Sequence, residues 1–297
     1  MTLQAKQSIK SRFIQYVLPS VAAMWVYTIY TMADGIFVAR GVGEQALAAV
    51  NLCMPMINGA FSMGILFAVG ASTKASIHKG RGDTQESNRV FTLGAMTVAS
   101  IGLLTTLFVL LLLPQLARLL GADAHTLPYV KGYLGIIGLF LPFYMTSYYL
   151  EVLVKADGFP KLAIKTSIAG AMTNIVLDAI FVLVFHWGIA GAAAATVFSQ
   201  YVSGVGLLAY TFLRCREFLP SRAELRFRKE TLRELLDLSM LTCAQQSAMN
   251  FGILLIQRLV DSFGPITMAA FAAAVKIDTF ASVSYTHLRA HETLRYL

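Results

Sequence analysis

Two aspartates, Asp34 and Asp178, lie within long apolar stretches of this sequence, where ionisable side chains are rare. Asn174 precedes Asp178 by four residues, so in a helix both side chains occupy one face. Thr196 adds a hydroxyl group in a third apolar stretch. Carboxylate, amide and hydroxyl oxygens suit a small hard cation, and a desolvated aspartate also binds a proton. We therefore expect Asp34, Asn174, Asp178 and Thr196 to form a cation site for H⁺ or Na⁺.

The composition indicates that these apolar stretches are membrane spans. Hydrophobic residues make up 57% of the 297 residues and charged residues 13%, whereas soluble proteins have about 45–50% and about 25%. Runs long enough to cross roughly 30 Å of hydrocarbon are predicted at residues 14–39, 46–77, 90–113, 127–154, 162–186, 188–213, 234–260 and 265–282.

Lysine and arginine are distributed unevenly over the predicted loops. Loops on the side of the N-terminus carry 16 of these residues and the opposite loops carry four. The positive-inside rule therefore predicts a cytoplasmic N-terminus. This distribution also accounts for the net charge of +8, so no nucleic-acid partner is expected. We expect a multi-pass, monomeric protein among the lipids of a bacterial inner (plasma) membrane.

The orientation gives the four polar residues a common depth. At 1.5 Å per residue, Asp34 lies roughly 8 Å from the outer end of its span, Thr196 about 10 Å and Asp178 about 12 Å. Ionisable groups inside a membrane are costly and usually functional. The alternative is that these groups only bridge helices, as buried Asn and Thr often do.

The basic stretch 214–233 separates two groups of spans. Similar segments at 43–49 and 264–270 lie at corresponding span junctions, which predicts parallel repeats. The predicted fold is an all-α polytopic membrane helix bundle. It has a six-helix N-lobe at 1–213, a cytoplasmic linker at 214–233 and the first two helices of a C-lobe at 234–282. The tail at 283–297 resembles a translated cloning adaptor and is expected to be non-native.

Four further residues are candidates for substrate movement. Pro19 removes a hydrogen bond from the first span and should bend it, either as a gate or as a static kink. Tyr27 and Tyr30 are candidates to line a cavity and stack on flat cations, with core packing as the alternative. Lys276 lies near the middle of the last predicted span and is the fourth candidate.

Two segments resemble the multidrug and toxic compound extrusion (MATE) transporters. Asp34-Gly-Ile-Phe-Val-Ala-Arg-Gly-Val-Gly with Leu47-Ala-Ala resembles their first helix, and Asn174-Ile-Val-Leu-Asp178 with Gly188-Ile-Ala-Gly-Ala-Ala and Ala195-Thr196 resembles their fifth and sixth. The resemblance covers about residues 10–282 and implies a twelve-helix, two-lobed exporter that exchanges organic cations for protons or sodium, without a cofactor. It also implies that Asp34, Asn174, Asp178 and Thr196 hold the ion and that Pro19 is the bending position. Relative to that pattern, the sequence stops within the eighth helix.

Secondary active export of drugs by alternating access, as antiport with H⁺ or Na⁺, is thus the expected function. A lipid-linked precursor flippase is the alternative, but it would favour basic cavity residues to hold pyrophosphate, and the membrane charges of the first lobe are acidic. A membrane-embedded enzyme would need an intramembrane nucleophile and base or a metal cluster, and the sequence shows neither. We therefore expect no catalytic residues and no enzyme activity.

Overall fold

A computed structural model describes residues 25–26, 28–214, 229–261, 263, 271 and 274. The chain forms two compact units, one of residues 33–254 and one of residues 1–32 with 255–297. Almost all the described residues belong to the first unit, and they are helical. Three of the predicted site residues, Pro19, Tyr27 and Lys276, lie outside the described residues, as does the predicted tail at 283–297.

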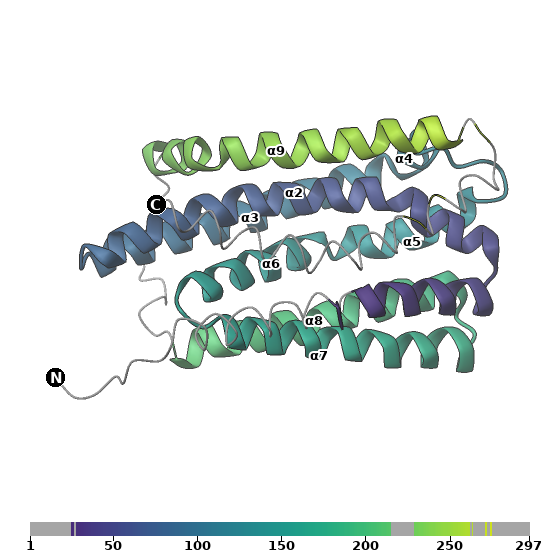
Figure 1. Cartoon of the computed structure of the whole chain (residues 1–297), viewed down its shortest axis with the longest axis horizontal. Coiled ribbons are helices and arrows are strands. Elements are labelled where there is room, and N and C mark those ends of the chain that lie inside the picture. Colours follow the sequence, from purple (N-terminus) through teal and green to yellow (C-terminus); the bar gives the residue numbers. More distant parts are fainter. Residues whose placement is uncertain are drawn as a thin grey trace. The chain divides into compact units, whose positions relative to one another are not determined.

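The chain is an all-α membrane helix bundle, as predicted (Figure 1). A helix at residues 28–41 is followed by α2 (Glu44–Gly80), α3 (Thr84–Leu111), the short α4 (Leu113–Leu119), α5 (Leu127–Leu139), α6 (Leu141–Ala156), α7 (Pro160–Asp178), the π-helix η1 (Ala179–Val184), α8 (Gly188–Arg214) and α9 (Lys229–Asp261). Among these, α2, α3, α7 with η1, and α8 are long and apolar enough to cross a membrane, and α5 with α6 makes a fifth span if taken together.

Prolines in the first turn begin four of the helices, where a missing N–H costs nothing. Pro142 has a second effect, because α5 and α6 are bent by 55° at their junction. Proline cannot donate to the carbonyl four residues before it, which here belongs to Gly138. The Thr106 hydroxyl in α3 donates to that carbonyl instead, at 2.7 Å. The bend is therefore held by a neighbouring helix, as a polar backbone group inside a membrane requires.

Aspartates order two of the turns between helices. Between α2 and α3, Asp83 caps the new helix by accepting from the Glu86 N–H at 3.1 Å, after Gly82 with a φ of 80°. Before α5, Asp123 accepts from the backbone N–H and the hydroxyl of Thr126, at 2.8 and 2.7 Å. The Thr126 side chain holds the pKa of Asp123 below its ordinary value near 3.8.

Close helix packing holds the bundle together. α7 packs on α8, α2 packs on α3 and α6, and α6 also packs on α3 and α8 (Figure 1). The buried side chains form two clusters at different levels, one including Val38, Ala49, Leu134, Val182 and Ala193, and the other including Ala71, Val90, Tyr149, Ala163 and Leu207. Since lipid tails are as apolar as leucine, small residues that let helix backbones approach are what favours such contacts.

Candidate functional site

Two close contacts between α7 and α8 fix which residues of these helices face each other. A Cβ atom on Gly170 would lie 3.0 Å from the Ser199 carbonyl oxygen, and one on Gly191 would lie 3.0 Å from the Phe181 carbonyl oxygen. The helices are thus antiparallel, and Asn174 and Asp178 fall between the two contacts. In this register Thr196 lies nearly level with Asn174.

The polar side chains of α7 are buried inside the bundle. Asn174 is 1% exposed and Asp178 is 0% exposed. Within the part of the chain that the structure describes, neither side-chain atom of the Asn174 amide and neither Asp178 carboxylate oxygen has a hydrogen-bond partner. Buried polar atoms are nearly always satisfied, which makes this pair a candidate for binding something small and polar.

The helix at residues 28–41 places Asp34 beside the buried pair of Asn174 and Asp178. A Cβ atom on Gly41 would lie 2.5 Å from the Val182 Cγ1 atom, so this glycine lets the helix lie close against η1. Asp34 lies two turns before Gly41, and Asp178 lies one turn before Val182. The carboxyl groups of Asp34 and Asp178 face each other close to hydrogen-bonding range, although Asp178 has no hydrogen bond of good geometry to any described residue.

The backbone changes form next to Asp178. This residue ends α7, and the π-helix η1 begins at Ala179. A π-turn widens the helix and shifts the side chains that follow it, and such turns are frequent at functional sites. The wider turn begins directly after Asp178, next to the candidate site.

Tyr133 in α5 is a site residue that the sequence analysis missed. It is 3% exposed, and its hydroxyl lies near the Thr196 side chain, Asp34, Asp178 and Cys53. The depth argument would have found it, because Tyr133 lies six residues inside the predicted span that begins at 127, roughly 9 Å at 1.5 Å per residue. Aromatic residues are common in membrane spans, so its type alone carries little signal.

The structure therefore brings residues of four helices to one small polar site. Asp34, Asn174, Asp178 and Thr196 lie close together there, with Tyr133 beside them. Tyr30 is half-buried and lies one turn before Asp34 in the same helix. Two carboxylates, an amide and two hydroxyls can hold a proton between the carboxylates or surround a dehydrated sodium ion.

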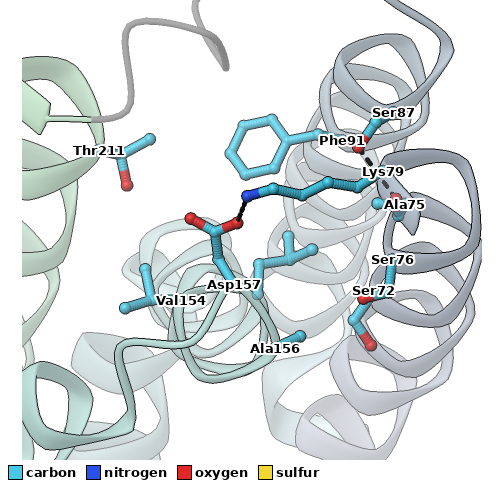
Figure 2. A pocket seen from close by; sticks show the side chains of 11 residues that line it. Ser72, Ala75, Ser76, Lys79, Ser87, Phe91, Val154, Ala156, Asp157 and Thr211 are labelled. Atoms are coloured by element: carbon cyan, nitrogen blue, oxygen red, sulfur yellow. Dashed lines mark hydrogen bonds and ion pairs between the residues drawn. The ribbon is translucent and has the colours of Figure 1, made fainter. Parts of the chain in front are cut away.

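A separate small pocket lies far from this site (Figure 2). Its volume is about 30 Å³, which holds a water molecule or two but no organic ligand. Lys79 of α2 and Asp157, just after α6, form an ion pair across it, with Ser76 and Thr211 nearby. Asp157 lies three residues before α7 begins and Asp178 ends that helix, so the length of α7, about 27 Å at 1.5 Å per residue, separates the pocket from the polar site.

Comparison with known proteins identifies the family. The MatE family model matches residues 19–180, which are more than half of the chain. This chain belongs to the MATE family of transporters. It is therefore not an enzyme, and its fold class is the expected one.

The MATE relatives are longer than this chain. Multidrug export protein MepA of Staphylococcus aureus (strain MSSA476) is 24% identical over 276 residues, which cover 93% of this chain and 61% of MepA. A MepA protein of Staphylococcus saprophyticus matches with the same identity and coverage. The chain thus spans about 61% of the length of these curated relatives.

Solved MATE structures share the fold. An outward-facing multidrug resistance MATE family transporter of the MOP superfamily superposes with a TM-score of 0.83 and 22% identity, covering 97% of this chain and 65% of that one. A crystal structure of MATE in complex with MaD3S gives a TM-score of 0.83 and 23% identity, covering 97% and 66%. The helix arrangement of this chain is thus that of the corresponding part of a MATE transporter.

Proposed function

We propose that the transporter to which this chain belongs is a secondary active exporter of organic cations and drugs that works by alternating access, as an antiporter of H⁺ or Na⁺. The observation that carries this proposal is the unsatisfied, fully buried pair of Asn174 and Asp178 facing Asp34. The relatives named as multidrug export proteins support the substrate class.

The coupling ion binds where the two carboxylates meet. Two facing carboxylates that are buried away from bulk solvent repel each other, so the pair favours taking up a proton or a sodium ion. Asn174 and Thr196 supply neutral oxygens, which a sodium ion needs in addition to the carboxylates and a proton does not. Thr196 is thus the residue whose removal distinguishes the two ions.

Ion binding changes how the helices pack around the site. Neutralising the charge between Asp34 and Asp178 removes a repulsion between the helix at 28–41 and α7, and the two helices move closer. Pro19 is the position at which the first helix bends in response. A ligand shifts such an equilibrium only through its different affinity for the two states, and here that difference arises from the carboxylate charge.

The acidic site also favours export of cations over flipping of a lipid-linked precursor. Carboxylates repel pyrophosphate, whereas they attract both the coupling ion and a cationic drug. We further propose a bacterial plasma membrane location with a cytoplasmic N-terminus, and a monomer.

The test is efflux of a fluorescent organic cation such as ethidium from membrane vesicles containing the full-length transporter. The pH gradient and the sodium gradient are imposed separately. Asp34→Asn and Asp178→Asn should each abolish ion-dependent efflux and leave membrane insertion intact, and Asn174→Ala should weaken it. Thr196→Ala should lower the sodium-driven rate much more than the proton-driven rate.

The matched control is Asp123→Asn, which removes an aspartate in an exposed turn and should leave efflux at the wild-type rate. Wild-type rates in both site aspartate variants, at matched protein levels, would remove these carboxylates from the mechanism.

A further inference from the structure

Glu151 is an ionisable residue in a membrane helix that the ion site does not use. It lies in α6, and its side chain is 21% exposed. Charged residues within membrane spans nearly always face the bundle interior or a water-filled cavity, so the face of α6 that carries Glu151 is not expected to face lipid. Lys155, one turn further along, donates to the Glu151 carboxylate at 2.6 Å.

Glu151 lies far from the ion site. α6 and α7 are joined by the short turn at 157–159, so distance along each helix from this turn can be compared. At 1.5 Å per residue, Glu151 lies about 8 Å from its end of the bundle and Asp178 about 27 Å. The two acidic sites are thus at different depths of the membrane.

Aromatic rings lie on the same side as Glu151. Tyr144 and Tyr148 precede it by seven and three residues, which places all three on one face of α6. Phe61 of α2 packs against both tyrosines, with ring centroids 6.0 Å from Tyr144 and 4.2 Å from Tyr148. Tyr148 is also close enough to Glu151 for the two groups to interact electrostatically. All four side chains are half-buried.

A polar residue of α2 extends this surface. Asn58 precedes Phe61 by three residues, lies in the membrane-spanning part of α2 and is exposed. An exposed amide in a membrane helix is also poorly suited to lipid, although less so than a carboxylate. We name Asn58, Phe61, Tyr144, Tyr148 and Glu151 the α2–α6 aromatic patch.

We propose that the α2–α6 aromatic patch binds the organic cation, with Glu151 as its counter-charge and Phe61 and Tyr148 as its ring contacts. Aromatic rings attract cations through their negative faces, most strongly where water is excluded. Without substrate, Lys155 pairs with the Glu151 carboxylate. The organic cation displaces Lys155 when it binds, so Lys155 competes with the cation for this carboxylate. This inference rests on the proposed function as a cation exporter. It adds that drug and coupling ion use different carboxylates and are coupled through the helices.

The test is equilibrium binding to the purified full chain in lipid nanodiscs. Tetraphenylphosphonium is the probe, and tetraphenylborate, which has the same shape and the opposite charge, is the comparison. We expect saturable binding of the cation and much weaker binding of the anion. Glu151→Gln should weaken cation binding roughly tenfold, as loss of a partly desolvated charge contact does, and Glu151→Asp should weaken it less.

Lys155→Gln separates a binding site from a structural ion pair. It frees the carboxylate, so it should tighten tetraphenylphosphonium binding several-fold, whereas Glu151→Gln weakens it. If the pair only stabilised the helix, both variants would change binding in the same direction or leave it unchanged. Glu86→Gln, which removes the carboxylate that pairs with Arg89 on α3, is the matched control and should leave binding unchanged.

Three results would overturn this proposal: no saturable cation binding to the wild-type chain, equal affinity in Glu151→Gln, or equal affinity for the two probes. Its failure is distinguishable from failure of the ion site. Asp34→Asn and Asp178→Asn should retain tetraphenylphosphonium binding, whereas Glu151→Gln should retain binding of the coupling ion.

Discussion

The buried amide of Asn174 and the carboxylate of Asp178 are costly to a folded protein. An unsatisfied buried polar group costs about 1–3 kcal/mol, and a charged one costs more, and the two residues leave four such atoms without partners among the described residues. A protein keeps such a costly group where the group has a functional role that permanent hydrogen bonds to neighbouring side chains would block. In the proposed mechanism, an ion bound between the carboxylates would satisfy some of these atoms and so offset part of this cost.

Tyr133 and Thr196 should act as one unit on the proposed ion site, because the Tyr133 hydroxyl lies near the Thr196 side chain and near both carboxylates. We expect Tyr133→Phe and Thr196→Ala each to weaken sodium binding, and the double variant to weaken it by less than the sum. Neighbouring residues in one network couple by about 0.5–3 kcal/mol. Binding of radioactive sodium to the three purified variants measures this coupling. Strict additivity would show that the two hydroxyls act on the ion independently.

At this scale the sequence could indicate four residues that the structure brings close together, but it did not indicate every neighbour of these four. Their role as an ion site stays a prediction. Asp34, Asn174, Asp178 and Thr196 could be predicted because polar groups at one depth of several membrane spans are unusual. Tyr133 was missed because tyrosine is ordinary in a span. The sequence did not indicate Glu151, because this residue lies near the end of its predicted span, where a carboxylate is easily assigned to the adjacent loop. Only the contacts of Phe61 with the tyrosines beside Glu151 draw attention to it.

The elements of the bundle depend on contacts that sequence periodicity does not reveal. The helices α2, α3, α7 and α8 lie close to their predicted ranges, because length and hydropathy determine a span. The 55° bend between α5 and α6 was not predicted, since a proline in a span only permits a bend. Thr106, from another helix, satisfies the carbonyl that the bend exposes. The π-helix after Asp178 was not predicted either, and it lies where Gly41 lets the helix at residues 28–41 come close to Val182.

Gly102 is required where α3 crosses the bent span. A Cβ atom at this position would lie 2.5 Å from the Pro142 Cα atom, and a backbone atom cannot rotate away. Gly102→Ala should therefore destabilise the fold by about 1–3 kcal/mol, the usual cost of overpacking. Thermal unfolding in detergent, followed by circular dichroism, measures this change.

Gly59→Ala in α2 is the matched control, because no atom lies within 4 Å of the added methyl group. Alanine is a better helix former than glycine, so this variant should be unchanged or more stable by about 0.5–1 kcal/mol. Equal unfolding temperatures for the two variants would contradict the close approach of α3 and α6.

At the scale of the whole molecule, this chain is shorter than the MATE proteins that it matches. The match to solved MATE structures covers 97% of this chain but only 65–66% of the chains in those structures. The six-helix N-lobe and the start of a second lobe remain predictions about its organisation. The ion site and the α2–α6 aromatic patch lie within residues 33–254, one compact unit, so both can be tested on the chain as it is. Their coupling to transport is a property of the full-length transporter.

Membrane orientation is the whole-molecule prediction on which the direction of transport depends. The excess of Lys and Arg on the side of the N-terminus predicts that the turn before α3 is cytoplasmic. The turn between α4 and α5 follows one membrane crossing and should therefore be external. Gln85→Cys and Ala124→Cys probe these turns, since both positions are exposed. The substitution of Ala124 also leaves the hydrogen bonds between Asp123 and Thr126 intact.

In a background without the native cysteines, an impermeant thiol reagent added to intact cells should label Ala124→Cys and spare Gln85→Cys. After the membrane is permeabilised, both should be labelled, which controls for accessibility. The reverse labelling pattern in intact cells would mean that the protein has the opposite membrane orientation. The ion site would then lie nearer the cytoplasm and the α2–α6 aromatic patch nearer the outside, so a cation bound from the cytoplasm would meet the ion site first. Labelling thus decides which of the two sites a drug leaving the cell reaches before the other.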